Sequence, residues 1–146
     1  MSRPRLPQIL AYMTPFPFSI DIEAPLAEAH AFLRERHIRH LPVTRGGVLA
    51  GVLTDRDIKL ALGPDLGSPP ERELRVSDVF QPECYVVDAG DHLEEVAATM
   101  AERHVGSALV TRAGKLVGIF TTTDACRALA RVLREQHPDS PPDQVA

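Results

Sequence analysis

The sequence predicts an α+β protein made of two tandem β-α-β-β-α repeats that pack about a pseudo-twofold axis. Three observations predict this fold. The chain aligns with itself at an offset of 67 residues, both copies show the same order of strand-like and helix-like segments, and the whole chain has only 146 residues. One copy alone is too short to bury a stable core, so the two copies are expected to pack on each other.

The internal alignment runs without a gap and matches Tyr12–Leu62 with Val79–Leu129. The identical pairs are spread over its whole length and include Pro15/Pro82, Asp21/Asp88, Leu26/Leu93, Arg36/Arg103, His37/His104, Thr44/Thr111, Gly51/Gly118, Thr54/Thr121 and Asp57/Asp124. An ungapped match of this length indicates duplication, and two copies are too few for a solenoid.

Each repeat begins with a short β-prone run followed by a helix. Phe18–Asp21 and Cys84–Asp88 have the composition of strands. Apolar residues then recur three and four positions apart, as in an amphipathic helix. They are Leu26, Ala29, Phe32 and Leu33 in the first copy and Leu93, Val96, Ala97 and Met100 in the second. Pro25 suits the first turn of one helix, and Asp91 is the expected N-cap of the other.

A hairpin and a second helix complete each repeat. The hairpin strands are HLPVT and VLAGVL in the first copy, and SALVT and KLVGIF in the second. The connecting RGG and RAG are tight turns in which a glycine supplies a positive φ. The second helix is expected to begin at Thr54 and at Thr121.

These signals divide the chain into four parts. Repeat 1 covers residues 9–62 and repeat 2 covers residues 74–134. The Gly- and Pro-rich residues 63–73 form the predicted linker, and the polar residues 135–146 form a tail that we expect to be disordered. The first eight residues are expected to be loose as well.

Composition indicates a cytoplasmic protein and argues against two kinds of partner. The net charge is −4 and Lys and Arg form no run, so nucleic-acid binding is not expected. The apolar runs are far shorter than the ~20 residues of a membrane span, and the N-terminus lacks the apolar core of a signal peptide. Cys84 and Cys126 match no ligand spacing and are expected to be reduced thiols.

One motif, Gly-apolar-x-Thr-x-x-Asp, begins at Gly51 and again at Gly118. Thr54 stands between a strand and a helix, and Asp57 falls at N3, so the motif is interpretable as a capping box worth about 1 kcal/mol. The alternative is a ligand site, because a helix N-terminus suits a phosphate and a carboxylate accepts both hydroxyls of a ribose.

The double β-α-β-β-α pattern resembles a CBS domain pair, the regulatory module named after cystathionine β-synthase. The segments that carry the resemblance are YMTP, HIRHLPV and GVLTDRD in repeat 1, and ALVTRAGKLVG and GIFTTTD in repeat 2. It covers about Ile9 to Arg134. The resemblance implies a regulatory ligand, namely AMP, ADP, ATP or S-adenosylmethionine. It also implies that the protein requires no cofactor.

In the CBS family the equivalent Asp holds the ribose and the equivalent Thr lies near the sugar and phosphate. The implied ribose and phosphate site comprises Thr54, Arg56, Asp57, Arg39, His40, Thr121, Thr123 and Asp124. By the same resemblance an adenine slot lies between the first strand and the next strand of a repeat. Its candidates are Ser19, Ile20, Leu41, Val86, Val87 and Ala108, with ordinary sheet core as the alternative.

The two copies differ in charge at the expected site. Arg39 and His40 precede LPV in repeat 1, and Arg56 stands at the helix start. The aligned residues in repeat 2 are Gly106, Ser107 and Thr123. The first cleft is therefore expected to accept a phosphorylated adenosine, and the second an uncharged adenosyl group or nothing. The alternative is that the three cationic side chains are solvated surface positions.

Neither catalysis nor metal binding is expected. No nucleophile stands in an elbow motif or beside a base. His37 and His40 are three residues apart, but no Cys or carboxylate pattern accompanies them. His37 and His104 instead suit the C-terminal ends of helices.

Two functions stay open from the sequence. One is a stand-alone sensor that binds an adenosyl ligand between the repeats and modulates a separate partner. The other is a ligand-free dimerisation or scaffold module in which Thr and Asp serve only as caps. The resemblance also implies a disc-shaped homodimer, whereas the regulated protein is not identifiable.

Overall fold

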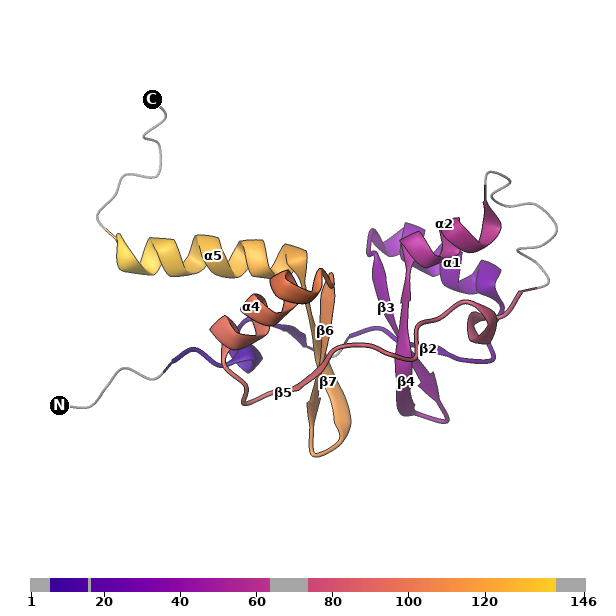
Figure 1. The fold of residues 1–146 in the computed structure, drawn as a ribbon, viewed down its shortest axis with the longest axis horizontal. Helices are drawn as coiled ribbons and strands as arrows, with labels where there is room; N and C mark the ends of the chain where they lie inside the picture. Colours follow the sequence, from indigo (N-terminus) through magenta and orange to yellow (C-terminus); the bar gives the residue numbers. More distant parts are fainter. Residues whose placement is uncertain (1–5, 16, 64–73, 139–146) are drawn as a thin grey trace, which may run out of the picture.

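Two α+β lobes lie side by side in the computed structural model, which describes residues 6–15, 17–63 and 74–138 (Figure 1). Lobe 1 consists of β2 (Ile20–Asp21), α1 (Leu26–Arg36), β3 (His40–Arg45), β4 (Val48–Thr54) and α2 (Asp55–Leu62). Lobe 2 consists of β5 (Val86–Asp88), α4 (Leu93–Arg103), β6 (Ser107–Arg112), β7 (Lys115–Thr121) and α5 (Thr122–Gln136). The predicted tandem β-α-β-β-α fold is confirmed.

The two sheets have the same pairing. β2 is parallel to β3, β3 is antiparallel to β4, and β5, β6 and β7 repeat both relationships. Both hairpin turns need positive φ at two residues: Gly46 (56°) and Gly47 (84°) in lobe 1, and Ala113 (52°) and Gly114 (78°) in lobe 2. The left-handed conformation is uncommon for a residue with a side chain. The two turns therefore share one backbone conformation, although Ala113 stands where lobe 1 has Gly46.

Each lobe has its own apolar core, and a third cluster joins them. The helices α1 and α2 cover the lobe 1 sheet, and α4 and α5 cover the lobe 2 sheet (Figure 1). Between the lobes, Val52 of β4 packs with Leu109 of β6 and Ile119 of β7, and all three are buried. None of the helices in the described ranges has the length and apolar character to span a bilayer.

The segment that precedes the first strand of each repeat packs on the other lobe. We name these segments strap 1 (residues 6–15) and strap 2 (residues 74–82). Ile9 of strap 1, fully buried, belongs to the lobe 2 core, and Val76 of strap 2 belongs to the lobe 1 core. Strap 1 ends in β1 (Thr14–Pro15), which is antiparallel to β7. Strap 2 makes the equivalent bridge between Gln81 and Val52, with backbone bonds of 3.0 and 2.8 Å.

The predicted sequence repeats, residues 9–62 and 74–134, exchange their straps, so each core is completed by an apolar side chain from the other repeat's strap. Residues 64–73 of the predicted linker and 139–146 of the predicted tail lie outside the described residues. Helix α5 continues to Gln136, two residues into that tail.

The straps also cap the first helix of each lobe, which overturns two local expectations. Asp91 is not the N-cap of α4: His92 holds that position, and Asp91 Oδ2 accepts the Asp88 backbone N–H at 2.9 Å. The Leu93 N–H donates instead to the Pro7 carbonyl of strap 1 at 2.8 Å, so residues near Pro7 are engaged rather than loose. In lobe 1 the Leu26 N–H donates likewise to strap 2.

Ile9→Ala is expected to destabilise lobe 2, although Ile9 belongs to the first repeat of the sequence. Truncating a fully buried isoleucine removes about 2–5 kcal/mol of stability. Hydrogen exchange should therefore show lost protection in α4, β6 and β7. The matched control is Leu10→Ala, because Leu10 is 38% exposed. Loss of protection confined to lobe 1 in Ile9→Ala would contradict the strap exchange.

Candidate functional site: two clefts between the lobes

Two clefts related by the 67-residue offset lie between the lobes. Cleft 1 is at the start of α2 and has a volume of about 810 Å³. Cleft 2 is at the start of α5 and has a volume of about 450 Å³. One wall of each cleft is the Thr-x-x-Asp motif of one repeat. The opposite wall comes from the other repeat, through its strap and the residues just before its hairpin. Each cleft is thus built from both repeats.

The Thr-x-x-Asp motif forms a capping box in both lobes, as one of the two interpretations predicts. In cleft 1 Thr54 Oγ1 accepts the Asp57 backbone N–H at 3.1 Å, and Asp57 Oδ2 accepts the Thr54 backbone N–H at 3.1 Å. Asp57 Oδ1 also accepts the Gln81 side-chain amide of strap 2 at 2.7 Å. Capping does not exclude ligand binding, because both residues also line the cavity.

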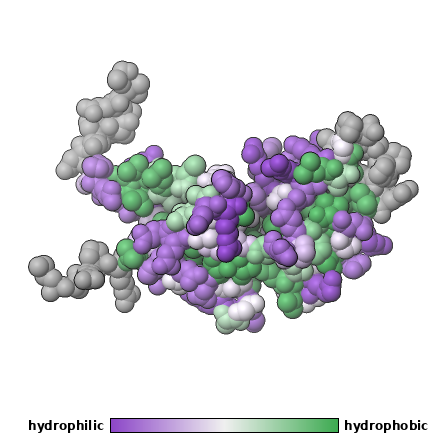
Figure 2. Space-filling view, in the orientation of Figure 1, coloured by the Kyte–Doolittle hydropathy of each residue, from purple (hydrophilic) through white to green (hydrophobic). Residues whose placement is uncertain are grey.

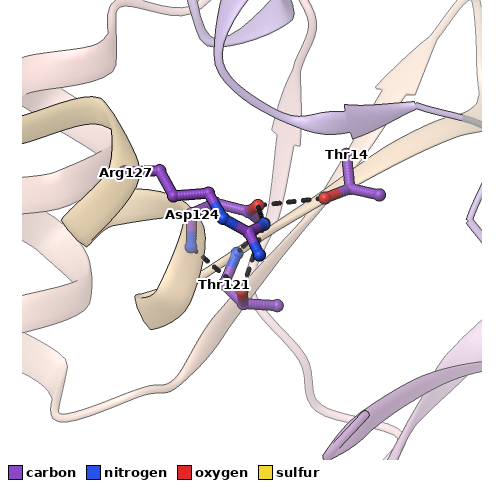
Figure 3. A network of polar contacts seen from close by, with 4 residues as sticks. All are labelled: Thr14, Thr121, Asp124 and Arg127. Carbon is purple, nitrogen blue, oxygen red and sulfur yellow. Dashed lines mark hydrogen bonds and ion pairs between the residues drawn. The ribbon is translucent and has the colours of Figure 1, made fainter. Parts of the chain in front are cut away.

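The equivalent carboxylate in cleft 2 has more partners (Figure 3). Asp124 accepts from the backbone N–H and the hydroxyl of Thr121 at 2.9 and 3.1 Å. The Thr14 hydroxyl of strap 1 donates to it at 3.0 Å, and Arg127 approaches it to 3.5 Å. Asp124 is only 5% exposed, whereas Asp57 is half-buried. The two motifs therefore have the same backbone geometry but different access.

Arg39 and His40 line both clefts. His40 begins β3 opposite Thr54, and its ring lies against Gly106, where an added Cβ would stand 2.8 Å from His40 Cε1. Its buried Nδ1 has no hydrogen-bond partner among the described residues. Burial lowers the pKa of His40, the neighbouring Arg39 lowers it further, and Asp57 acts in the opposite direction. The imidazole is therefore biased toward its neutral form between the two cavities.

Aromatic side chains that the motif search missed line the opposite walls. Tyr85 faces cleft 1 beneath the Arg103 guanidinium, which lies 5.2 Å from the ring centroid. Phe18 faces cleft 2, and Phe32 holds it edge to face at 5.3 Å. Phe18 and Tyr85 stand a few residues after the ends of the two straps and align with each other at the 67-residue offset. This alignment of two aromatic residues could have been found in the sequence. Cys84 also borders cleft 1, and burial raises the pKa of its thiol.

The structure brings together the predicted ribose and phosphate residues but not the predicted adenine slot. Thr54, Arg56 and Asp57 line cleft 1, and Thr121, Thr123 and Asp124 line cleft 2. The six adenine-slot candidates line neither cleft. They are Ser19, Ile20, Leu41, Val86, Val87 and Ala108. Four of them, Ile20, Leu41, Val87 and Ala108, are buried among core side chains, because inward-facing strand positions point away from the clefts.

The expectation that the second cleft lacks charge is wrong. Because each cleft is built across the repeats, Arg39 and His40 reach cleft 2, where Arg127 joins them. In cleft 1 the same pair is joined by Arg56 and Lys59, and Lys59 is paired with Asp55 at 2.8 Å. No group of three or more His, Cys, Asp or Glu side chains is placed to hold a metal ion in the described ranges.

Two α+β lobes with strap exchange and paired clefts define a CBS pair, a regulatory module. The chain belongs to the CBS domain family, whose model matches residues 9–63 and 76–131. A CBS domain-containing protein of Dictyostelium discoideum is 30% identical over 132 residues, covering 84% of this chain and 91% of that protein. Hypoxic response protein 1 of Mycobacterium tuberculosis is 35% identical over 108 residues, covering 71% of this chain and 72% of that protein.

A solved structure supports the same assignment. The crystal structure of CBSX2 in complex with AMP superposes with a TM-score of 0.75 at 28% identity. The match covers 88% of this chain and 99% of that chain. The predicted family and fold are therefore confirmed.

Lowering the pH is expected to destabilise the fold through His40. Its folded pKa lies below the ordinary value of 6.5, so the unfolded chain takes up the proton first. The stability that the neutral, buried His40 contributes to the fold is thus fully present above pH 6.5. It is lost as the pH falls through the folded pKa. The measurement is the free energy of unfolding by urea near neutral pH and at about pH 5. The decrease between the two pH values should be smaller in His40→Gln than in the wild type.

The matched control for that measurement is His137→Gln, because His137 is exposed just after α5. It should leave the pH dependence as in the wild type. An unchanged pH dependence in His40→Gln would contradict the role assigned to its burial.

Proposed function

We propose that this chain is a regulatory sensor that binds an adenosine-containing ligand between its lobes and modulates a separate partner protein. The ligand class is AMP, ADP, ATP or S-adenosylmethionine. The observation that carries the proposal is the composition of cleft 1. The cavity combines a helix N-terminus, a half-buried carboxylate at Asp57 and the cationic side chains of Arg39 and Arg56.

These groups match the parts of an adenosine phosphate. The α2 N-terminus and the guanidinium groups of Arg39 and Arg56 suit a phosphate. The Asp57 carboxylate suits the vicinal hydroxyls of a ribose. Tyr85 and Val105 present apolar surface on the opposite wall, where a purine base can pack. The proposal assigns the base to this wall instead of the core positions that the sequence indicated.

The similarity to CBSX2 supports the ligand class. That protein was crystallised with AMP and is 28% identical to this chain. The ligand would act on the partner by favouring one arrangement of the two lobes, and only to the extent that it binds that arrangement more tightly than the other.

A thermal-shift screen with AMP, ADP, ATP and S-adenosylmethionine tests the proposal. At 100 times its dissociation constant a ligand stabilises the fold by about 2.7 kcal/mol, which is several degrees in Tm for a chain of this size. GMP and UMP are matched controls, because they carry the same ribose and phosphate with another base. If none of the four compounds shifts Tm at millimolar concentration, the ligand-free scaffold is the better interpretation.

We also propose that two copies associate through α2 and α5. Three leucines on these helices are strongly exposed: Leu60 (72%), Leu129 (60%) and Leu133 (48%). Figure 2 shows apolar side chains gathered over α5. Exposed apolar side chains gathered on helices are typical of interfaces, because burying them is favourable.

The double substitution Leu129→Glu/Leu133→Glu is expected to yield a monomer in sedimentation velocity, because two charges would be buried unpaired at the interface. Val48→Glu is the matched control, since Val48 is 68% exposed on the lobe 1 hairpin, away from both helices. A wild-type chain that sediments as a monomer would exclude this dimer.

A further inference from the structure

We propose that the chain binds one adenosyl ligand, in cleft 1, and that Thr14 and Arg127 close cleft 2 by occupying the carboxylate of Asp124. This inference rests on the proposed function. It adds which cleft is filled and which side chains decide it.

The carboxylate of Asp124 is saturated by the protein itself (Figure 3). Its Oδ2 accepts the backbone N–H and the hydroxyl of Thr121, and its Oδ1 faces the hydroxyl of Thr14 and Nη1 of Arg127. A carboxylate offers about four lone-pair positions. All of them are therefore engaged, and a ribose diol, which needs two, has to displace an internal donor.

The carboxylate of Asp57 has room for the same diol. Its Oδ2 accepts the Thr54 backbone N–H, and its Oδ1 accepts the side-chain amide of Gln81. No other donor in the described ranges reaches it. About two of its lone-pair positions thus remain open to a ligand.

Two sequence differences at matched positions explain this contrast. At the 67-residue offset Thr14 aligns with Gln81, and Arg127 aligns with Leu60. Leu60 lines cleft 1 but has no donor, and it is 72% exposed.

Displacing the cleft 2 donors is more costly. Asp124 is 5% exposed, so a ligand that displaces the Thr14 hydroxyl has to replace its hydrogen bond to a buried charge, whereas the Arg127 side chain, 3.5 Å away and 74% exposed, is the weaker of the two partners. Thr14 is also fixed by the pairing of β1 with β7, opposite Ile119. Cleft 2 is in addition the smaller cavity, at about 450 Å³ against about 810 Å³. Strap 1 and α5 thus close it from two sides.

Isothermal titration calorimetry of the full chain with AMP, and in parallel with ATP and S-adenosylmethionine, tests the inference. The wild type is expected to bind one equivalent per chain. Asp57→Asn should lose that binding at least tenfold while keeping its unliganded Tm close to the wild-type value, because the Asn side-chain oxygen at N3 still accepts the Thr54 backbone N–H. Thr14→Val/Arg127→Leu, which gives cleft 2 the leucine of cleft 1, should gain a second equivalent.

Each other outcome has a distinct meaning. Two equivalents in the wild type, or undiminished binding in Asp57→Asn, would overturn the assignment to cleft 1 while leaving the proposed function intact. One equivalent in a folded Thr14→Val/Arg127→Leu would overturn the role of those side chains. No binding of any of the three compounds by the wild type or by the double variant would defeat the proposed function itself.

Discussion

The close approach of each strap to the opposite lobe is the contact on which the rest of the structure depends. It is possible only because the last strand of each hairpin carries a glycine there. A Cβ at Gly51 would collide with the Gln81 carbonyl oxygen, and one at Gly118 would collide with the Met13 sulfur. The glycine of the repeated motif thus allows the strap to approach the strand. The threonine and aspartate of the same motif cap the helix that follows.

Strap exchange makes each cleft a joint product of the two repeats. The strap leads into the aromatic residue that lines the cleft, and the residues before the hairpin complete that wall. The Gly106 carbonyl accepts the Thr122 N–H and the Arg39 carbonyl accepts the Asp55 N–H. Within each lobe the start of the second helix is therefore tied to the residues just before that lobe's own hairpin. A ligand in either cleft would contact both repeats and so be sensitive to their relative position.

The pseudo-twofold symmetry is broken where the clefts meet. The His40 ring occupies space beside Gly106 that a side chain at position 106 would need. Arg39 and His40 therefore serve two cavities, whereas Gly106 and Ser107, their counterparts, add no charge. The two motif carboxylates also differ. Asp124 is contacted by Thr14 and Arg127. At the matched positions Asp57 has Gln81, which donates to it, and Leu60, which has no donor. Duplicated backbone geometry therefore does not imply duplicated chemistry.

Local signals in the sequence determined the order of the elements, both hairpins and both capping boxes, because each rests on residues within a few positions of one another. Thr54 with Asp57, and Thr121 with Asp124, were identifiable as helix starts on this ground. The cap of α4 was not, since its acceptor is Pro7, far away in the chain. The tertiary structure decided which repeat supplies the wall opposite each Thr-x-x-Asp motif. It also decided how many donors contact Asp57 and Asp124, and that Arg39 and His40 line both clefts. The reason is the exchange of straps, a packing of distant segments to which no short-range pattern corresponds.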